Sequence, residues 1–167
     1  MVLPTPEGLA AARRRMRAAL DYAEAHCPAG DVPVAALVED ARGRLLAAAT
    51  NRREADGDPT AHAEVLALRA AAARLGDGWR LTGCTITVTL EPCAMCAGAI
   101  MAARLARVEF GAFEPKTGAC GSRWDLLRDR ASPLPAPEVR GGVLAEEAAR
   151  PLRGFFSKTN NSGRFPG

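Results

Sequence analysis

The chain of 167 residues lacks the long apolar stretches of membrane proteins. No stretch approaches the roughly 18 uninterrupted apolar residues of a helical membrane span, and the first residues lack the apolar run of a signal peptide. The sequence also lacks internal repeats and any stretch with the composition of an interdomain linker. We therefore expect a single domain in the cytoplasm, without contact to a membrane.

A disulfide framework is also missing. The five cysteines are an odd number and lack the regular spacing of a disulfide-rich domain, which favours a reducing compartment. A chain of this size buries about 70% of its unfolded surface and needs no covalent cross-links. The formal charge of +3 and the pI near 8.8 permit a polyanionic partner but do not identify one.

Two short motifs carry the chemistry of this sequence. The first is the His-x-Glu motif of His62 and Glu64, and the second is the Pro-Cys-x-x-Cys motif of Cys93 and Cys96. One imidazole and two thiolates give zinc three protein ligands and leave its fourth tetrahedral position open, which is typical of a catalytic site. The motifs therefore predict one zinc ion per chain, held by His62, Cys93 and Cys96.

Each motif has a simpler interpretation when it stands alone. A histidine at the start of a helix is more often a surface or cap residue, and a Cys-x-x-Cys pair can be redox-active. A closed structural zinc site would need a fourth ligand, but the remaining candidates form no second pair with the spacing usual in zinc knuckles or fingers: His26, Cys27, Cys84 and Cys120. The two motifs together match the signature of zinc-dependent nucleobase deaminases.

Glu64 is the candidate general acid and base. A neutral imidazole and two thiolates cancel the charge of zinc(II), so this site acidifies water less than an all-histidine site, and an added base becomes useful. We expect Glu64 to accept a proton from the attacking water and to return it to the leaving ammonia.

Hydrophobic periodicity and turn residues predict an alternation of helices and strands. We expect helices over 5–26, 60–74 and 93–104, a polar loop over 51–59, a short helix near Trp124, and strands over 32–38, 44–49, 86–90, 107–112 and 139–143. A terminal helix follows, which Pro151 should kink or interrupt. Both metal motifs then lie at helix N-termini, where the helix dipole favours anionic ligands.

Longer stretches of the sequence carry a resemblance to a known family. They are Val32-Pro33-Val34, Asn51-Arg52, 58–64, 90–99, 116–119 and Phe155-Phe156. In these stretches the chain resembles the bacterial tRNA-specific adenosine deaminases of the cytidine and deoxycytidylate deaminase superfamily. The resemblance spans most of the chain, apart from the termini and 128–138.

The resemblance implies an α/β fold of three layers, α/β/α, with a central mixed five-stranded sheet. It also implies a homodimer that converts the wobble adenosine of an arginine tRNA anticodon stem-loop to inosine. Asn51 would then bind the flipped nucleotide, Glu114 and Lys116 would contact the anticodon loop, and Phe155 and Phe156 would shape the RNA-binding surface. The residues alone leave other roles open, because asparagine can stabilise a turn and phenylalanines are common in the core face of a helix.

We expect one zinc-dependent deaminase domain over 1–157 and a short basic tail over 158–167. From Arg150 onward the chain carries four basic residues and no acidic one, namely Arg150, Arg153, Lys158 and Arg164, which suits phosphate contacts or a solvated tail equally well. Two alternatives stay open. One is a deaminase of free guanine, cytosine or deoxycytidylate, and the other is a non-catalytic zinc-stabilised RNA-binding subunit, against which Glu64 argues.

Overall fold

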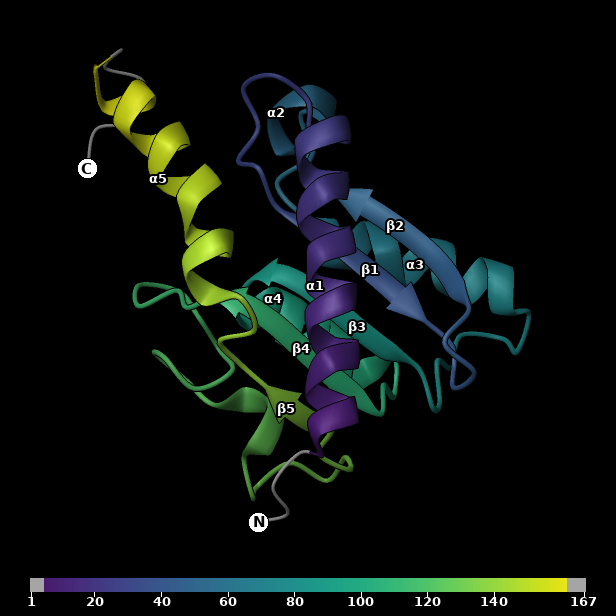
Figure 1. The fold of residues 1–167 in the computed structure, drawn as a ribbon. Coiled ribbons are helices and arrows are strands. Elements are labelled where there is room, and N and C mark those ends of the chain that lie inside the picture. Colours follow the sequence, from purple (N-terminus) through teal and green to yellow (C-terminus); the bar gives the residue numbers. More distant parts are fainter. Residues whose placement is uncertain (1–4, 162–167) are drawn as a thin grey trace.

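The computed structural model describes residues 5–161 and has one mixed sheet between two layers of helices (Figure 1). The strand order is β2-β1-β3-β4-β5, with β1 antiparallel to both of its neighbours and β3, β4 and β5 parallel. The strands are β1 (Ala35–Glu39), β2 (Leu45–Thr50), β3 (Thr85–Leu90), β4 (Arg107–Ala112) and β5 (Glu138–Arg140). The expected three-layer fold with a mixed five-stranded sheet is confirmed.

The helices divide between the two faces of the sheet. One face is covered by α1 (Pro6–His26) and α5 (Ala145–Asn161), and the other by α3 (Ala63–Leu75) and α4 (Ala94–Ala102). Both faces of the central strands are therefore buried, and four consecutive residues from Ile86 to Thr89 in β3 are inaccessible to solvent.

Local sequence explains where α1 begins and which side it buries. The hydroxyl of Thr5 accepts a hydrogen bond from the backbone N–H of Gly8 at 3.1 Å, and Pro6 occupies the first turn, where no N–H is needed. The buried side chains recur at helical spacing along one stripe that faces the sheet: Ala12, Met16, Ala19 and Ala23. The predicted helix over 5–26 is confirmed.

A buried charge lies where α1 crosses β4. The Glu109 carboxylate is fully buried and accepts hydrogen bonds from Arg15, Arg140 and the hydroxyl of Thr87. Because a buried carboxylate is costly unless it is paired and hydrogen-bonded, these contacts join α1, β3, β4 and β5 at one position.

Several boundaries differ from the sequence prediction. The segment 51–59 contains a short helix, α2 (Arg53–Asp56), and the 3-10 helix η1 (Leu126–Arg128) begins beyond Trp124. The first strand begins at Ala35, after Pro33, which has no N–H to donate to a ladder.

Of the kink or interruption expected at Pro151, the interruption does not occur. The α5 helix continues through Pro151 to Asn161, so the first residues of the expected tail are helical. The rest of that tail, including Arg164, lies outside the described residues. Within residues 5–161, no helix is long and apolar enough to cross a membrane.

Candidate metal centre and active site

The two sequence motifs meet in space. The Nδ1 atom of His62 lies 3.6 Å from Sγ of Cys93 and 3.5 Å from Sγ of Cys96. The ligand atoms of the three residues all lie within 4.8 Å of one another. A tetrahedral zinc ion with bonds of about 2.0 Å to nitrogen and 2.3 Å to sulfur would separate these atoms by about 3.5 Å. The cluster therefore has the size that zinc requires.

Two of these residues are N-caps. His62 precedes α3 and Cys93 precedes α4, both with extended backbone angles, and neither side chain caps its own helix. The prediction that His62 lies in the first helical turn is therefore wrong by one position. Since neither side chain is used as a cap, both are free to point at a shared metal, while the dipoles of α3 and α4 favour negative charge there.

The electrostatics of the thiols also fit a cation. The hydrogen bond from Cys96 lowers the pKa of Cys93 to about 4, against the opposing effect of burial, and His62 adds to the lowering. The same contact with Cys93, together with burial, raises the pKa of Cys96. One thiolate thus forms readily, and the second needs a positive ion beside it.

Glu64 lies next to the cluster in the first turn of α3. Its side chain is only 4% exposed, and burial raises the pKa of its carboxyl group. The buried position keeps bulk water from competing for the carboxylate. A carboxyl group beside an open metal position, with a raised pKa, is suited to accept and return a proton.

The pocket in front of the cluster has a volume of about 110 Å³. It is lined by residues from five segments, including His62, Glu64, Cys93, Asn51, Glu114 and Thr117. The structure therefore brings Asn51 and Glu114 into the same pocket as the metal cluster. The exposed Lys116 is not among its lining residues, although the neighbouring Thr117 is.

Asn51 is fixed by a second buried side chain. Its Nδ2 donates to the carboxylate of Asp31 at 3.2 Å, and the same carboxylate accepts hydrogen bonds from the backbone N–H groups of Glu54 and Ala55 in α2. Asp31 is 3% exposed. It holds both Asn51 and the short helix α2 at the rim of the pocket.

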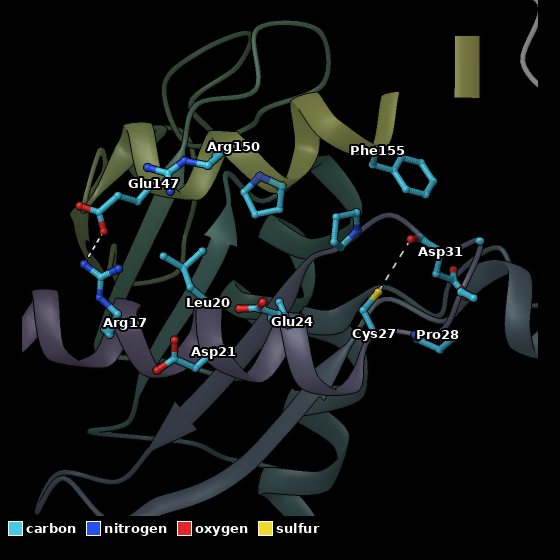
Figure 2. A pocket seen from close by; sticks show the side chains of 15 residues that line it. Arg17, Leu20, Asp21, Glu24, Cys27, Pro28, Asp31, Glu147, Arg150 and Phe155 are labelled. Carbon is cyan, nitrogen blue, oxygen red and sulfur yellow. Dashed lines mark hydrogen bonds and ion pairs between the residues drawn. The ribbon is translucent and has the colours of Figure 1, made fainter. Parts of the chain in front are cut away.

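The two phenylalanines of α5 point into different hollows. Phe156 is 45% exposed and lines a hollow of about 200 Å³ together with Asn51 and Arg53, which also line the metal pocket. Phe155 lines a larger groove of about 600 Å³ between α1 and α5. Figure 2 shows this groove, with Asp21 and Glu24 on one side and Glu147 and Arg150 on the other.

Comparison with known proteins identifies the family. The sequence pattern of the cytidine and deoxycytidylate deaminase zinc-binding region matches residues 10–112, which include both metal motifs. The chain belongs to this deaminase family. Zinc is therefore its cofactor, and the expectation of one zinc ion per chain is confirmed.

Individual relatives refine the position within the family. The deaminase is 45% identical over 146 residues to a tRNA-specific adenosine deaminase of Haemophilus influenzae, covering 87% of this chain and 83% of that protein. It is 48% identical over 143 residues to a tRNA(Ile)-lysidine synthase of Deinococcus deserti, covering 86% of this chain. The deaminase spans only 26% of the length of that lysidine synthase. It thus belongs to the group of the tRNA-specific adenosine deaminases.

Solved structures of two kinds of deaminase share the fold of this chain. A tRNA:A34 deaminase, studied for A-to-I editing at the wobble position of transfer RNA, superposes with a TM-score of 0.76 at 39% identity, over 82% of this deaminase and 97% of that chain. A guanine deaminase from Nitrosomonas europaea superposes with a TM-score of 0.69 at 28% identity, over 94% of this deaminase and 87% of that chain.

The roles of three residues in the pocket region were not predicted from the sequence. Asp31 and Glu91 are buried carboxylates that hold pocket segments, and Arg53 lines the pocket from α2. One signal for Glu91 was available, because it follows an apolar strand directly and precedes the cysteine motif. Nothing in the sequence links Asp31 to Asn51, since that contact depends on the fold.

Proposed function

We propose that this deaminase converts adenosine to inosine at the wobble position of a tRNA anticodon by zinc-dependent hydrolysis. The observation that carries the proposal is the cluster of His62, Cys93 and Cys96, with the buried Glu64 beside it at the end of a small pocket. In this reaction the oxygen of water bonds to C6 of the purine and the bond from C6 to the exocyclic nitrogen breaks, while one proton of the water ends on N1 and the other leaves with the nitrogen as ammonia.

The metal and its ligands have separate tasks from Glu64. His62, Cys93 and Cys96 would hold the zinc ion, which polarises water for attack when it is bound. Glu64 accepts the proton that the water loses and passes it to the departing nitrogen. Because Glu64 is held at the start of α3, next to His62, one carboxylate can reach both groups during the reaction.

The substrate contacts that we propose lie around the mouth of the pocket. Asn51 and Glu114 line the pocket itself and would contact the flipped nucleotide or its neighbour. The exposed Lys116 would contact a phosphate of the anticodon loop, and Phe156 offers an aromatic face in the adjoining hollow. Phe155 contributes indirectly, by its edge-to-face contact with Phe156.

Two observations favour RNA over a free base as the substrate. Two relatives that are 45% and 48% identical to this chain are named for reactions on tRNA, and one of them contains a segment similar to this deaminase within a longer tRNA-modifying protein. The hollow that contains Phe156 shares Asn51 and Arg53 with the metal pocket, so a group attached to the reacting base can extend into it. We extend the proposal to an arginine tRNA, a homodimer and a cytoplasmic location, in line with the family resemblance.

The rival function is deamination of a free purine or pyrimidine. The structural likeness to a guanine deaminase makes this the relevant alternative, because the zinc chemistry is common to both. The purified zinc-loaded protein should be incubated separately with an arginine tRNA anticodon stem-loop and with free adenosine, guanine, cytosine and deoxycytidylate. Inosine formed in the stem-loop alone supports the proposal.

Turnover of a free compound without inosine in the stem-loop would select the rival. Binding of the stem-loop without any conversion would select a non-catalytic role. Stem-loops with cytidine or guanosine at the wobble position are the matched controls, and sedimentation of the zinc-loaded protein at micromolar concentration tests the homodimer.

A further inference from the structure

We propose that Glu91 is a positioning residue, whose buried carboxylate folds the loop of residues 113–122 into the shape that binds RNA. The identity of the RNA rests on the proposed function, but the folding of the loop does not. Glu91 follows β3 and directly precedes Pro92 and the cysteine motif. It therefore joins the metal-bearing side of the pocket to its substrate-binding side.

The carboxylate of Glu91 is 2% exposed and is surrounded by donors from one loop. Its Oε2 accepts a hydrogen bond from the N–H of Glu114 at 3.0 Å and another from the hydroxyl of Ser122. Its Oε1 accepts from the N–H groups of Cys120 and Ser122, each at 3.0 Å. Both oxygens are thus used by the loop, at its beginning and at its end.

Glu91 has different hydrogen-bond partners from Glu109, the buried glutamate of β4. Glu109 is neutralised by the guanidinium groups of Arg15 and Arg140. Among residues 5–161, no arginine or lysine forms a hydrogen bond or ion pair with Glu91. Its four partners are neutral, and three of them are backbone N–H groups. The loop conformation itself therefore stabilises this charge, and the charge in turn stabilises the loop.

Close packing around Gly118 restricts the conformation of the loop. A Cβ atom on Gly118 would lie 2.5 Å from Cδ of Glu91 and 2.5 Å from the carbonyl oxygen of Glu114, so only glycine fits against the carboxylate. The loop also bridges to the cysteine motif, with Gly118 opposite Cys93 and with the N–H of Ala119 donating to the carbonyl of Pro92 at 2.8 Å.

The loop carries the proposed substrate contacts. Glu114 and Thr117 line the pocket, and the carboxylate of Glu114 accepts a hydrogen bond from the N–H of Lys116 at 2.9 Å. The N–H of Glu114 is held by Glu91, so the position of this short segment depends on Glu91. Loss of the carboxylate should move the RNA contacts while the three metal ligands stay in place.

The test uses Glu91→Gln with Glu109→Gln as the matched control. Glutamine keeps the size of the side chain, but its amino group must face at least one backbone N–H donor of the loop. Glu109→Gln perturbs an equally buried carboxylate of the neighbouring strand, away from the pocket. Ser122→Ala removes one of the four hydrogen bonds and serves as a milder variant if Glu91→Gln does not fold.

Three quantities are measured on the full-length zinc-loaded proteins. They are the zinc content, the hydrogen exchange of the amides of Glu114, Cys120 and Ser122, and the affinity for a fluorescein-labelled anticodon stem-loop with adenosine at the wobble position. Affinity is measured in a Glu64→Ala background, which prevents conversion of the RNA.

For Glu91→Gln we expect an unchanged zinc content, faster hydrogen exchange at these amides, and about 10- to 100-fold weaker RNA binding. Glu109→Gln should leave all three quantities unchanged. Ser122→Ala should keep its zinc and show smaller increases in amide exchange and smaller losses of RNA affinity than Glu91→Gln.

Unchanged exchange and affinity in Glu91→Gln would overturn the proposal. Loss of zinc from this variant would also overturn it, because Glu91 would then support the metal site and not the loop. If the parent protein does not bind the stem-loop at all, the proposed tRNA substrate is wrong. Amide exchange alone then decides the role of Glu91.

Discussion

The guanidinium of Arg15 lies along both oxygens of the Glu109 carboxylate, with Nη2 2.7 Å from Oε1 and Nε 2.9 Å from Oε2. The side chain of Glu109 is fully buried and that of Arg15 is 17% exposed. This forked contact attaches α1 to the central sheet. The ion pair between Arg17, also in α1, and Glu147 in α5 is far more exposed.

Replacement of Arg15 should therefore destabilise the protein more than replacement of Arg17. Arg15→Ala leaves a buried carboxylate whose remaining hydrogen bonds, among residues 5–161, come from Arg140 and Thr87, which should lower the free energy of unfolding by about 3 kcal/mol. Arg17→Ala removes a solvent-exposed pair and should cost less than about 1 kcal/mol. Urea denaturation of both variants checks the difference, and equal midpoints would contradict it.

Glu64→Gln should separate proton transfer from metal binding. Glutamine fills the same space but cannot accept a proton, so the rate of deamination should fall by about 10²- to 10⁴-fold or more. The zinc content, measured by atomic emission, should stay at one ion per chain, because Glu64 is not one of the three clustered ligands. A variant that keeps its zinc and half of its activity would remove Glu64 from the mechanism.

Removal of zinc should lower the thermal stability. The ligands come from the starts of α3 and α4, so the ion connects two helices on one face of the sheet. At a free zinc concentration 100 times the Kd, binding contributes about 2.7 kcal/mol, which corresponds to about 5–10 °C in Tm for a protein of this size. Calorimetry before and after chelation, with zinc added back, measures the shift. Magnesium added back in place of zinc should not restore the Tm.

Two glycine substitutions should have opposite effects. Gly154 lies in α5, and no atom lies within 4 Å of the position that a Cβ atom would take there, so Gly154→Ala should stabilise the protein by about 0.5–1 kcal/mol. At Gly141 a Cβ atom would lie 2.3 Å from the ring of Phe110, so Gly141→Ala should cost about 1–3 kcal/mol. Thermal unfolding of the two variants tests the signs, and a stabilised Gly141→Ala would show that the Phe110 ring yields easily.

Cys120 should resist alkylation in the folded protein. Burial raises the pKa of its thiol from 9.0 to about 12, and the nearby carboxylates of Glu91 and Asp125 add to the effect. Because the folded pKa is raised, the contribution to stability is full below about pH 9 and is lost as the pH rises towards 12. Mass spectrometry after iodoacetamide treatment at pH 8 should find Cys120 unlabelled in folded protein and labelled in urea. Rapid labelling of the folded protein would contradict its burial.

The sequence was sufficient for the metal cluster and for most of the fold. The two motifs predicted three metal ligands in one cluster, because the chain has few histidines and cysteines and three of them have the spacing of a zinc site. The strand at Arg107–Ala112 was predicted with its observed boundaries, since its apolar run lies between clear turn signals. Pro151 misled the prediction because a proline removes one hydrogen bond, whereas α5 is held by tertiary packing of Ala148 and Leu152.

The surroundings of the cluster could not be predicted in the same way. Asp31 reaches Asn51 across 20 residues of sequence, and Glu91 reaches Ser122 across 31. Such contacts follow no local period, because they depend on which loops the sheet order brings together. The different positions of Phe155 and Phe156 also depend on the fold, which places Phe155 at the groove beside α1 and Phe156 at the hollow beside Asn51.

The hollows around Asn51 adjoin one another, and this arrangement has a pharmacological consequence. The metal pocket shares Asn51 and Arg53 with the hollow of Phe156, and that hollow shares Gly30 and Asp31 with the groove between α1 and α5. A small molecule bound in the groove would contact Asp31, whose carboxylate holds Asn51 at the rim of the metal pocket. Because the three clustered ligands do not line the groove, an inhibitor bound there would act through Asp31 and Asn51 and not through the zinc ion.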